Sequence, residues 1–436
     1  MGTYASRCLR ASAASAAAGA AIFTTPALAA APSTIEAADT AWMIVATAVV
    51  LMMTIPGLAL FYSGMVRKKN VLATMAQSLA AVMLISILWV ALGYSLAFVG
   101  DGAWIGTLDR AFLAGMGMES VHPGAKTIPE ALFMLYQMTF AIITVALVAG
   151  SVADRMRFSA YLVFGVAWFV FVYVPLAHWI WGGGFLAQAG VVDFAGGLVV
   201  HLSAGTGGLV AAVVMGRRHG YGSENLSPFD LSLAVVGTGL LWVGWFGFNG
   251  GSALGANAHA VMAILTTHLA ACAGAVTWGA LEWSTRRKPS VLGMISGAVA
   301  GLGTITPASG FVAPWHGLVI GALAGIICYW ACTSLKHRFN YDDSLDVFGV
   351  HGIGGLTGTV LAGVFATAAI GGTAGLIEGN PKQLAAQLYG VAVTLVWSGG
   401  VTWGLLKLVS VFVPLRVSRE QELEGLDISQ HGEALQ

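Results

Sequence analysis

The chain has 436 residues, of which 57% are hydrophobic and only 9% are charged, and its formal net charge is zero. Soluble domains carry about 25% charged residues, so this composition excludes a soluble enzyme and predicts an all-α protein that crosses a membrane many times. The zero net charge gives no reason to expect nucleic acid as a partner. The four cysteines show no spacing typical of a disulfide framework or a metal site, and we expect no metal and no cofactor.

The first residues have the pattern of a secretory signal peptide. Arg7 and Arg10 precede an alanine-rich segment, and Ala27-Leu28-Ala29 offers a cleavage site of the A-x-A type. The alternative is an unstructured N-terminal extension. We therefore predict three parts, which are a signal peptide at 1–31, a membrane domain at 40–414 and a cytoplasmic regulatory tail at 415–436.

The membrane domain contains eleven apolar runs, each long enough to cross a bilayer, which takes about 20 residues of helix. In chain order, these spans 1 to 11 are expected near 41–63, 71–99, 128–150, 158–181, 195–215, 229–251, 257–282, 290–308, 313–334, 346–369 and 384–413.

The charges between the spans predict the orientation. The loops after spans 1, 3, 5, 7 and 9 contain twelve lysines and arginines, whereas those after even-numbered spans contain only Arg110, Lys126 and Lys382. Because basic loops stay in the cytoplasm, the N-terminus is expected outside and the C-terminus inside. Cleavage of a signal peptide predicts the same orientation.

Two histidines lie in apolar, glycine-rich runs, and each follows an aspartate. Asp193 precedes His201 on span 5, and Asp346 precedes His351 on span 10. An ionisable side chain at bilayer depth is costly and suggests a function, although a single membrane histidine is often a packing residue. Since five is odd, a repeat of spans 1–5 onto 6–10 must be inverted, which is typical of transporters with a site between the halves. Span 11 is then expected to be an additional, outer helix. We expect Asp346 to cap span 10.

Aromatic side chains cluster near the predicted external ends of other spans. Tyr136 and Phe140, four residues apart, share one face of span 3. Trp181 and Ser252 end spans 4 and 6 on the same side of the membrane. Aromatic faces with a hydroxyl acceptor suit a small cation that donates hydrogen bonds. The alternative is a belt of interfacial aromatics.

Five segments carry a family resemblance: TIPGLALFYSGMVRKKN, ADRMRFSAYLVFG, DFAGGLVVH, GWFGFNGGS and DVFGVHG. From residue 40 to its end, the chain resembles the ammonium transporter family (Amt/Mep/Rh), and specifically its bacterial Amt branch. The resemblance implies an external ammonium-binding site at Trp181, Ser252, Tyr136 and Phe140. It also implies a gate of stacked rings at Phe140 and Phe248. In the best-known bacterial relative, phenylalanine replaces Tyr136.

The resemblance further implies that His201 and His351 line the pore, and that Asp193 and Trp245 support the site. It implies a homotrimer, a role in nitrogen metabolism, and a PII signal protein that meets the tail at EGLDISQHGE. We therefore expect a transporter of the inner (cytoplasmic) membrane that binds ammonium, deprotonates it and conducts ammonia. Two alternatives stay open, an ammonium sensor that signals through the tail and a neutral-gas channel of the Rh type.

Overall fold

The computed structural model describes residues 34–435, and the predicted signal peptide at 1–31 lies outside the described residues. Within 34–435 the chain is helical, with two isolated β-bridges and no longer strand. Ten helical segments are long and apolar enough to cross a membrane. The eighth expected span is a shorter apolar helix, α12 (Val291–Ile305). The all-α prediction is confirmed, and the number of eleven spans stays a prediction.

The first half of the chain forms five long helical segments, several of which change from α-helix to π-helix partway. Span 1 consists of α1 (Ala37–Met52), η1 (Met53–Leu58) and α2 (Ala59–Met65). Span 2 consists of η2 (Lys68–Asn70), α3 (Val71–Leu88), η3 (Trp89–Gly93) and α4 (Tyr94–Phe98). A loop with η4 (Ala111–Leu113) leads to span 3, α5 (Glu130–Val152). Span 4 consists of α6 (Phe158–Trp168), η5 (Phe169–Tyr173) and α7 (Val174–Ile180), followed by α8 (Phe185–Gln188). Span 5 is η6 (Gly197–Leu202) and α9 (Ser203–Met215).

The second half repeats long helices and ends in a short tail. Spans 6 and 7 are α10 (Leu231–Gly251) and α11 (Ala258–Arg286). After α12, span 9 consists of α13 (Pro314–Trp330), η7 (Ala331–Leu335) and α14 (Lys336–Phe339). Span 10 is η8 (Phe348–Gly352) and α15 (Ile353–Phe365), followed by α16 (Ala368–Gly371). Span 11 is α17 (Pro381–Phe412), and the tail contains α18 (Arg419–Glu424) and η9 (Asp427–His431).

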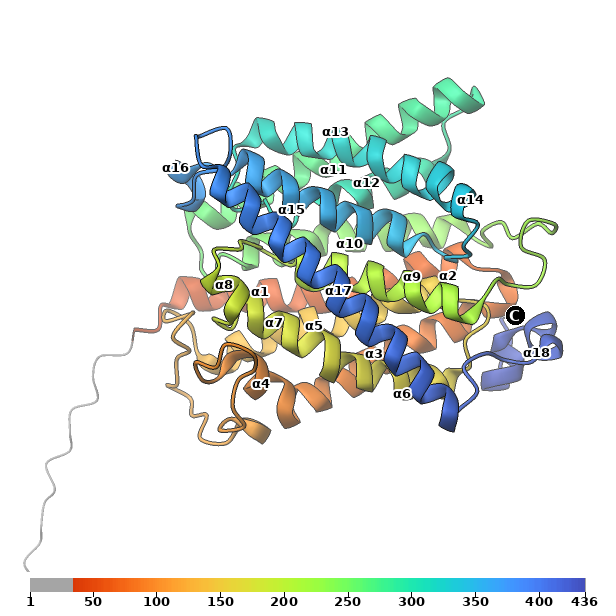
Figure 1. The fold of residues 1–436 in the computed structure, drawn as a ribbon, viewed down its shortest axis with the longest axis horizontal. Coiled ribbons are helices and arrows are strands. Elements are labelled where there is room, and N and C mark those ends of the chain that lie inside the picture. The colour runs from red at the N-terminus through yellow and green to blue at the C-terminus, as the bar shows by residue number, and fades with distance from the viewer. Residues whose placement is uncertain (1–33, 436) are drawn as a thin grey trace, which may run out of the picture. The chain divides into compact units, whose positions relative to one another are not determined.

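The long helices run side by side, with the start of α1 near α8 and α16 at one end and the tail at the other (Figure 1). We call these the α16 end and the α18 end. The long helix α17 crosses obliquely over its neighbours (Figure 1) and packs against α9, α15 and α6. The most enclosed span is α5, because 83% of its apolar window is buried. The core therefore surrounds α5 and the neighbouring α9, which directly follows the π-helical segment that contains His201.

The segments that carry the two histidines cross each other at glycines. The backbone of Gly352 lies directly against Gly205, and the backbone nitrogen of Leu202 would lie 2.8 Å from a Cβ added to Gly355. The pattern is reciprocal, because Gly205 and Gly355 each follow their own histidine by four residues, and Gly352 and Leu202 each follow it by one. Small residues at such a crossing let two backbones approach closely.

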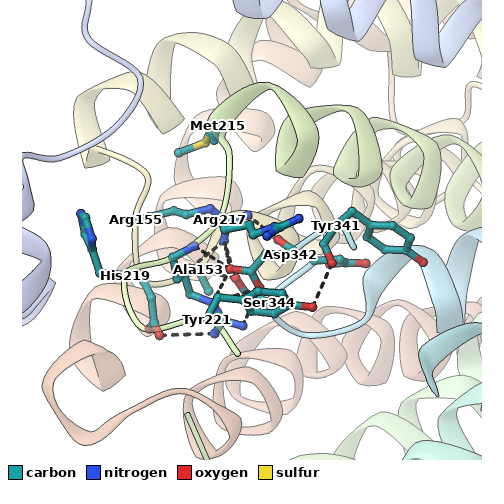
Figure 2. Close-up of polar contacts among 12 residues, drawn as sticks. Ala153, Arg155, Met215, Arg217, His219, Tyr221, Tyr341, Asp342 and Ser344 are labelled. Atoms are coloured by element: carbon teal, nitrogen blue, oxygen red, sulfur yellow. Dashed lines mark hydrogen bonds and ion pairs between the residues drawn. The ribbon is translucent and has the colours of Figure 1, made fainter. Parts of the chain in front are cut away.

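A buried ion-pair network joins four loops at the α18 end. Arg218 binds the carboxylate of Asp342 with an N–O distance of 2.7 Å and lies 3.5 Å from Asp154, which also pairs with Arg67 at 3.0 Å. Figure 2 shows Arg155 beside Asp342, where it donates to the Asp342 carbonyl oxygen. Charges buried in this way are stable only when they are paired and hydrogen-bonded, so the network fixes the relative positions of these loops.

The tail packs against the same loops and does not project from the molecule. Glu422 pairs with Arg416 at 2.7 Å and accepts the backbone N–H of His219 at 2.8 Å. Asp427 accepts the backbone N–H groups of Leu72 and Ala73 at the start of α3, at 3.1 and 2.8 Å. A carboxylate in this position satisfies free donors of the helix and complements its dipole. The tail is therefore bound to the first turn of span 2.

Candidate functional site

The two predicted pore histidines face each other. The Nδ1 atoms of His201 and His351 lie 3.2 Å apart, and the side chains are almost fully buried. Each histidine lies in a π-helical turn that begins its span, η6 for His201 and η8 for His351. A hydrogen bond between two Nδ1 atoms needs one donor and one acceptor, so in the neutral pair the two imidazoles take different tautomers.

The histidines line a narrow apolar lumen. The lumen has a volume of about 10 Å³ and is lined by twelve residues, of which the histidines are the only ionisable ones. This volume is close to the minimum for one water molecule. The Nε2 atom of His201 is buried and has no hydrogen-bond partner among the described residues. The lumen therefore suits a small molecule that both donates and accepts hydrogen bonds.

The predicted gate rings stack on each other, and one of them lies beside His201. Phe140 and Phe248 are nearly parallel, at an angle of 22° and a centroid distance of 4.1 Å. The Phe248 ring lies 6.2 Å from the His201 ring, and the Phe140 ring lies 5.6 Å from Trp181. The aromatic column therefore runs without a break from Trp181 through the two phenylalanines to His201.

Two predicted mouth residues meet at the end of α10. The hydroxyl oxygens of Tyr136 and Ser252 lie 3.3 Å apart, and the ring of Tyr136 packs edge-on against Phe140 at 5.0 Å. Trp181, which directly follows α7, completes this arrangement, because its ring contacts Phe140. The structure thus brings the predicted substrate residues together around the Phe140 ring.

The two predicted supporting residues act on different parts of the site. The carboxylate of Asp193 accepts four consecutive backbone N–H groups, those of residues 196 to 199 at the start of η6, at 2.6 to 3.2 Å. The carbonyl oxygen of Asp193 accepts the indole N–H of Trp181 at 2.8 Å. Trp245 stacks on His201 at 5.5 Å and donates to Thr306 at 2.9 Å. Asp193 therefore anchors both the mouth and the segment that carries His201.

The comparison with known proteins decides the family. The sequence profile of the Ammonium Transporter Family matches residues 41–435. The chain belongs to the ammonium transporter family.

Relatives in this family align along almost their whole length. An ammonium transporter of Bacillus subtilis is 47% identical over 91% of this chain and 97% of the relative, and Amt1 of Archaeoglobus fulgidus is 43% identical over 91% and 98%. The crystal structure of Saccharomyces cerevisiae Mep2 is similar with a TM-score of 0.83 and 37% identity, over 89% of each chain. These relatives are membrane transporters and not enzymes, which confirms the resemblance and the prediction that the chain is not an enzyme.

The protein has a wide vestibule at the α18 end, on the far side of the histidines from the gate rings. It has a volume of about 720 Å³, reaches His351, and is lined by aromatic, basic and acidic side chains that include Phe61, Arg217, Lys336 and Asp346. The lumen and the vestibule share Phe61, Val299 and His351. A molecule that passes the histidine pair therefore enters a polar, open chamber.

The prediction that Asp346 caps span 10 is wrong, because Asp343 binds the start of this span. Asp343 accepts the backbone N–H of Phe348 at 2.7 Å, while Asp346 pairs with Lys336 at 2.7 Å. Asp346 has a positive φ of 56°, so the chain turns there before the helix begins. Which aspartate caps the helix depends on this turn, and the spacing of residues along the sequence does not reveal the turn.

Sequence reasoning also missed a supporting residue on span 11. The amide of Gln387 accepts the backbone N–H of Val192 at 2.8 Å and donates to the carbonyl oxygen of Val192 at 2.7 Å. Gln387 is fully buried, and Val192 directly precedes Asp193. The signal in the sequence that points to Gln387 is a polar side chain within an otherwise apolar span. Span 11, which the sequence predicts as an outer helix, thus helps to hold the mouth.

Proposed function

We propose that this protein transports ammonium through a pore in its own subunit. The cation is recruited at the aromatic mouth of the α16 end and loses a proton near the phenylalanine pair. Neutral ammonia then passes the two histidines and enters the vestibule. Membership of the ammonium transporter family and the continuous column of rings above the histidines support this sequence of steps.

Electrostatics favours removal of the proton over passage of the cation. Moving an unpaired ammonium ion into an apolar lumen costs tens of kcal/mol in the Born limit. Deprotonation near neutral pH costs about 4.6 kcal/mol if the pKa is about 10.4, as for a lysine ammonium. Potassium cannot lose a proton and meets the full barrier, so the same lumen accounts for selectivity.

The single observation that carries the proposal is the contact between His201 and His351. Their Nδ1 atoms are 3.2 Å apart, and the other described residues that line this lumen are not ionisable. Neutral imidazoles offer ammonia both a donor and an acceptor, and the pair is suited to relay the released proton. We propose that ammonia and the proton both cross, so that one net charge moves in each cycle.

We propose that the α16 end faces the outside of the inner (cytoplasmic) membrane and the α18 end faces the cytoplasm, with eleven spans. The basic loops after odd-numbered spans support this orientation. The reciprocal glycine contacts of spans 5 and 10 support an inverted repeat.

We also propose a homotrimer that serves nitrogen metabolism, with a cleaved signal peptide. The proposed regulatory partner is a PII protein that binds the α18 end, where the tail and the vestibule lie.

A second candidate function is ammonium sensing. A solved structure described as a sensor Amt protein is similar to this chain, with a TM-score of 0.83 and 28% identity over 90% of this chain and 98% of the other. A sensor would bind ammonium at the same mouth and change its contacts at the tail, with little flux. Transport is the stronger candidate because the lumen, which Phe248 lines, shares lining residues with the open vestibule.

The decisive experiment is an ammonium jump on proteoliposomes, with potassium as the control. Transport predicts a current with ammonium and none with potassium, and loss of that current in the double variant His201→Ala, His351→Ala while the protein stays folded. Ammonia uptake without current would replace the charge-moving mechanism by neutral gas conduction. Binding without uptake or current would favour the sensor.

A further inference from the structure

An ammonium group that belongs to the protein is bound in the vestibule. Lys336 donates from Nζ to the carbonyl oxygen of Asp343 at 2.7 Å and to Oδ1 of Asp346, also at 2.7 Å. Lys336 and Asp346 line the vestibule together with His351. One carbonyl oxygen and one carboxylate oxygen thus hold a primary ammonium group on the vestibule side of the histidine pair.

The backbone around this ammonium group resembles the backbone at the mouth. Asp193 and Asp343 each lie eight residues before their histidine, and each accepts the backbone N–H of the residue five positions later. The carbonyl oxygen of Asp193 accepts the indole N–H of Trp181 at 2.8 Å, whereas that of Asp343 accepts from Lys336. The donor is therefore a neutral side chain at the mouth and a cation in the vestibule.

The two acceptors of Lys336 suit any small cation that donates hydrogen bonds. A lysine ammonium group has three N–H donors and no acceptor, and two acceptors face it here. Free ammonium has the same charge and one donor more, so it is able to make the same two bonds. The bond to the Asp346 carboxylate is charge-assisted, which is the stronger kind of hydrogen bond. While Lys336 fills this position, free ammonium is excluded from it.

We propose that Lys336 is a tethered ammonium group that fills a cation-binding site in the vestibule and keeps free ammonium from binding there. The effect on transport rests on the proposed function, in which the pore opens into this chamber. With the vestibule site filled, ammonium is bound at the mouth and not at the other end. The concentration that half-saturates transport is then set separately on the two sides of the membrane, while the equilibrium across the membrane is unchanged.

The competing explanation is an ion pair with a purely structural role. The side chain of Asp346 is 37% exposed and that of Lys336 is 12% exposed. Water is therefore able to hydrate the carboxylate when the lysine is removed, and ion pairs with exposed partners contribute little to stability. We expect Lys336→Ala to fold and to leave the two oxygen acceptors vacant. A structural ion pair predicts no new binding site in this variant, whereas a tethered ammonium group predicts one.

The first test measures binding without transport. The cation n-propylammonium has the carbon and nitrogen atoms that Lys336→Ala removes, so its chloride salt should raise the melting temperature of the solubilised variant. Tetramethylammonium chloride at the same concentration carries the same charge but has no N–H donor, and it should cause no such rise. The rise should be absent in the wild type and in the double variant Lys336→Ala, Asp346→Asn. No rise in Lys336→Ala, or an equal rise in the wild type, would overturn the proposal.

The second test measures ammonium currents in membrane vesicles of both orientations. With ammonium applied at the α18 end, half-saturating ammonium should be about two- to tenfold lower in Lys336→Ala than in the wild type, the effect of one hydrogen bond. With ammonium applied at the α16 end, half-saturation should not change. Unchanged half-saturation at the α18 end would show that the vacated position does not take part in transport and would overturn this part of the proposal.

The matched control is Arg217→Ala, which also removes a cation that lines the vestibule. Arg217 donates to the carbonyl oxygen of Asn340 at 3.0 Å and has no ion-pair partner within residues 34–435. Its removal vacates no carboxylate, so half-saturation at the α18 end should not fall. An equal fall in both variants would assign the effect to the general charge of the vestibule and overturn a specific site. If the wild type carries no current, the proposed transport fails, while the melting temperatures still decide whether the site exists.

Discussion

The backbone of Gly352 lies against Gly205 so closely that no side chain fits between them. The contact lies one residue after His351 and four residues after His201, and Gly355 makes the reciprocal contact with Leu202. This pair of contacts fixes the crossing of spans 5 and 10. Because each histidine lies next to the crossing, the geometry of the crossing determines the 3.2 Å distance between the two Nδ1 atoms.

We predict that Gly205→Ala separates the two histidines. The new methyl group would overlap the Gly352 backbone, which cannot move away as a flexible side chain would. Overpacking of this kind typically costs about 1–3 kcal/mol, and the ammonium current should fall by at least about tenfold if the histidine contact opens by an ångström. Proteoliposome currents and thermal unfolding in detergent check both effects.

The matched control for this variant is Gly404→Ala on α17. A Cβ at Gly404 meets open space, and alanine favours helix over glycine by about 0.5–1 kcal/mol. It should therefore keep the wild-type current and the wild-type or slightly higher stability. An unchanged current in Gly205→Ala would show that the crossing does not determine the histidine geometry.

We predict that Asp193→Asn weakens the mouth and the start of span 5. The aspartate accepts four backbone N–H groups with two oxygens, whereas asparagine has one acceptor oxygen and an NH₂ group that faces the remaining donors. Buried donors without a partner cost about 1–3 kcal/mol each. The melting temperature should fall and half-saturating ammonium should rise, because Trp181 is bound to the Asp193 carbonyl.

Asp230→Asn provides the comparison for Asp193. Asp230 caps α10 with hydrogen bonds to the backbone N–H groups of Ser232 and Leu233, in a more exposed position. Solvent can replace part of this interaction, so the loss of stability should be smaller and half-saturation should not change. Equal effects of the two variants on half-saturation would contradict the anchoring role of Asp193.

We predict that Asp342→Asn destabilises the loops at the α18 end in a pH-dependent way. Burial alone would raise the pKa of Asp342, but the hydrogen bonds and charge of Arg218, together with the charge of Arg155, lower it below its ordinary value of 3.8. Removal of one partner from a buried ion pair costs about 3 kcal/mol or more. The melting temperature near neutral pH should therefore fall clearly.

The sign of the pH effect follows from the lowered pKa of Asp342. The stabilisation is fully present above the unfolded pKa of 3.8 and disappears as the pH falls through the lower folded value. The difference in melting temperature between the wild type and Asp342→Asn should thus be constant from neutral pH down to about pH 5 and shrink below about pH 4. A difference that changes mainly between pH 6 and 8 would implicate another group.

We predict that Asp427→Ala releases the tail. The carboxylate binds the first turn of α3 through Leu72 and Ala73, and loss of such a cap typically costs about 1 kcal/mol. Amide hydrogen exchange in residues 419–431 and limited proteolysis should accelerate, while the melting temperature of the membrane domain should change little. Glu433→Ala, an exposed acidic residue in the same tail, is the control. Equal exchange in both variants would show that the cap does not hold the tail.

The sequence alone determined the all-α class and the approximate apolar helices, and it singled out the residues that we propose for the pore. Apolar runs separated by basic loops are visible without coordinates because bilayer thickness sets the length of each run. The cost of ionisable groups in an apolar span singled out His201 and His351, and the structure places them in contact. The tyrosine at 136 was visible as a residue, but not the bonds of its hydroxyl.

Only the tertiary structure decided which groups face each other. The Nδ1–Nδ1 contact, the four N–H groups on Asp193, and the hydrogen bond from Tyr136 to the carbonyl oxygen of Phe248 all join residues from different segments or depend on a local turn. Asp343, and not Asp346, caps span 10 for the same reason, since the backbone turns at Asp346 with a positive φ. Hydrogen bonds depend on distances of a few tenths of an ångström, and side-chain packing sets those distances, whereas residue spacing along the chain does not.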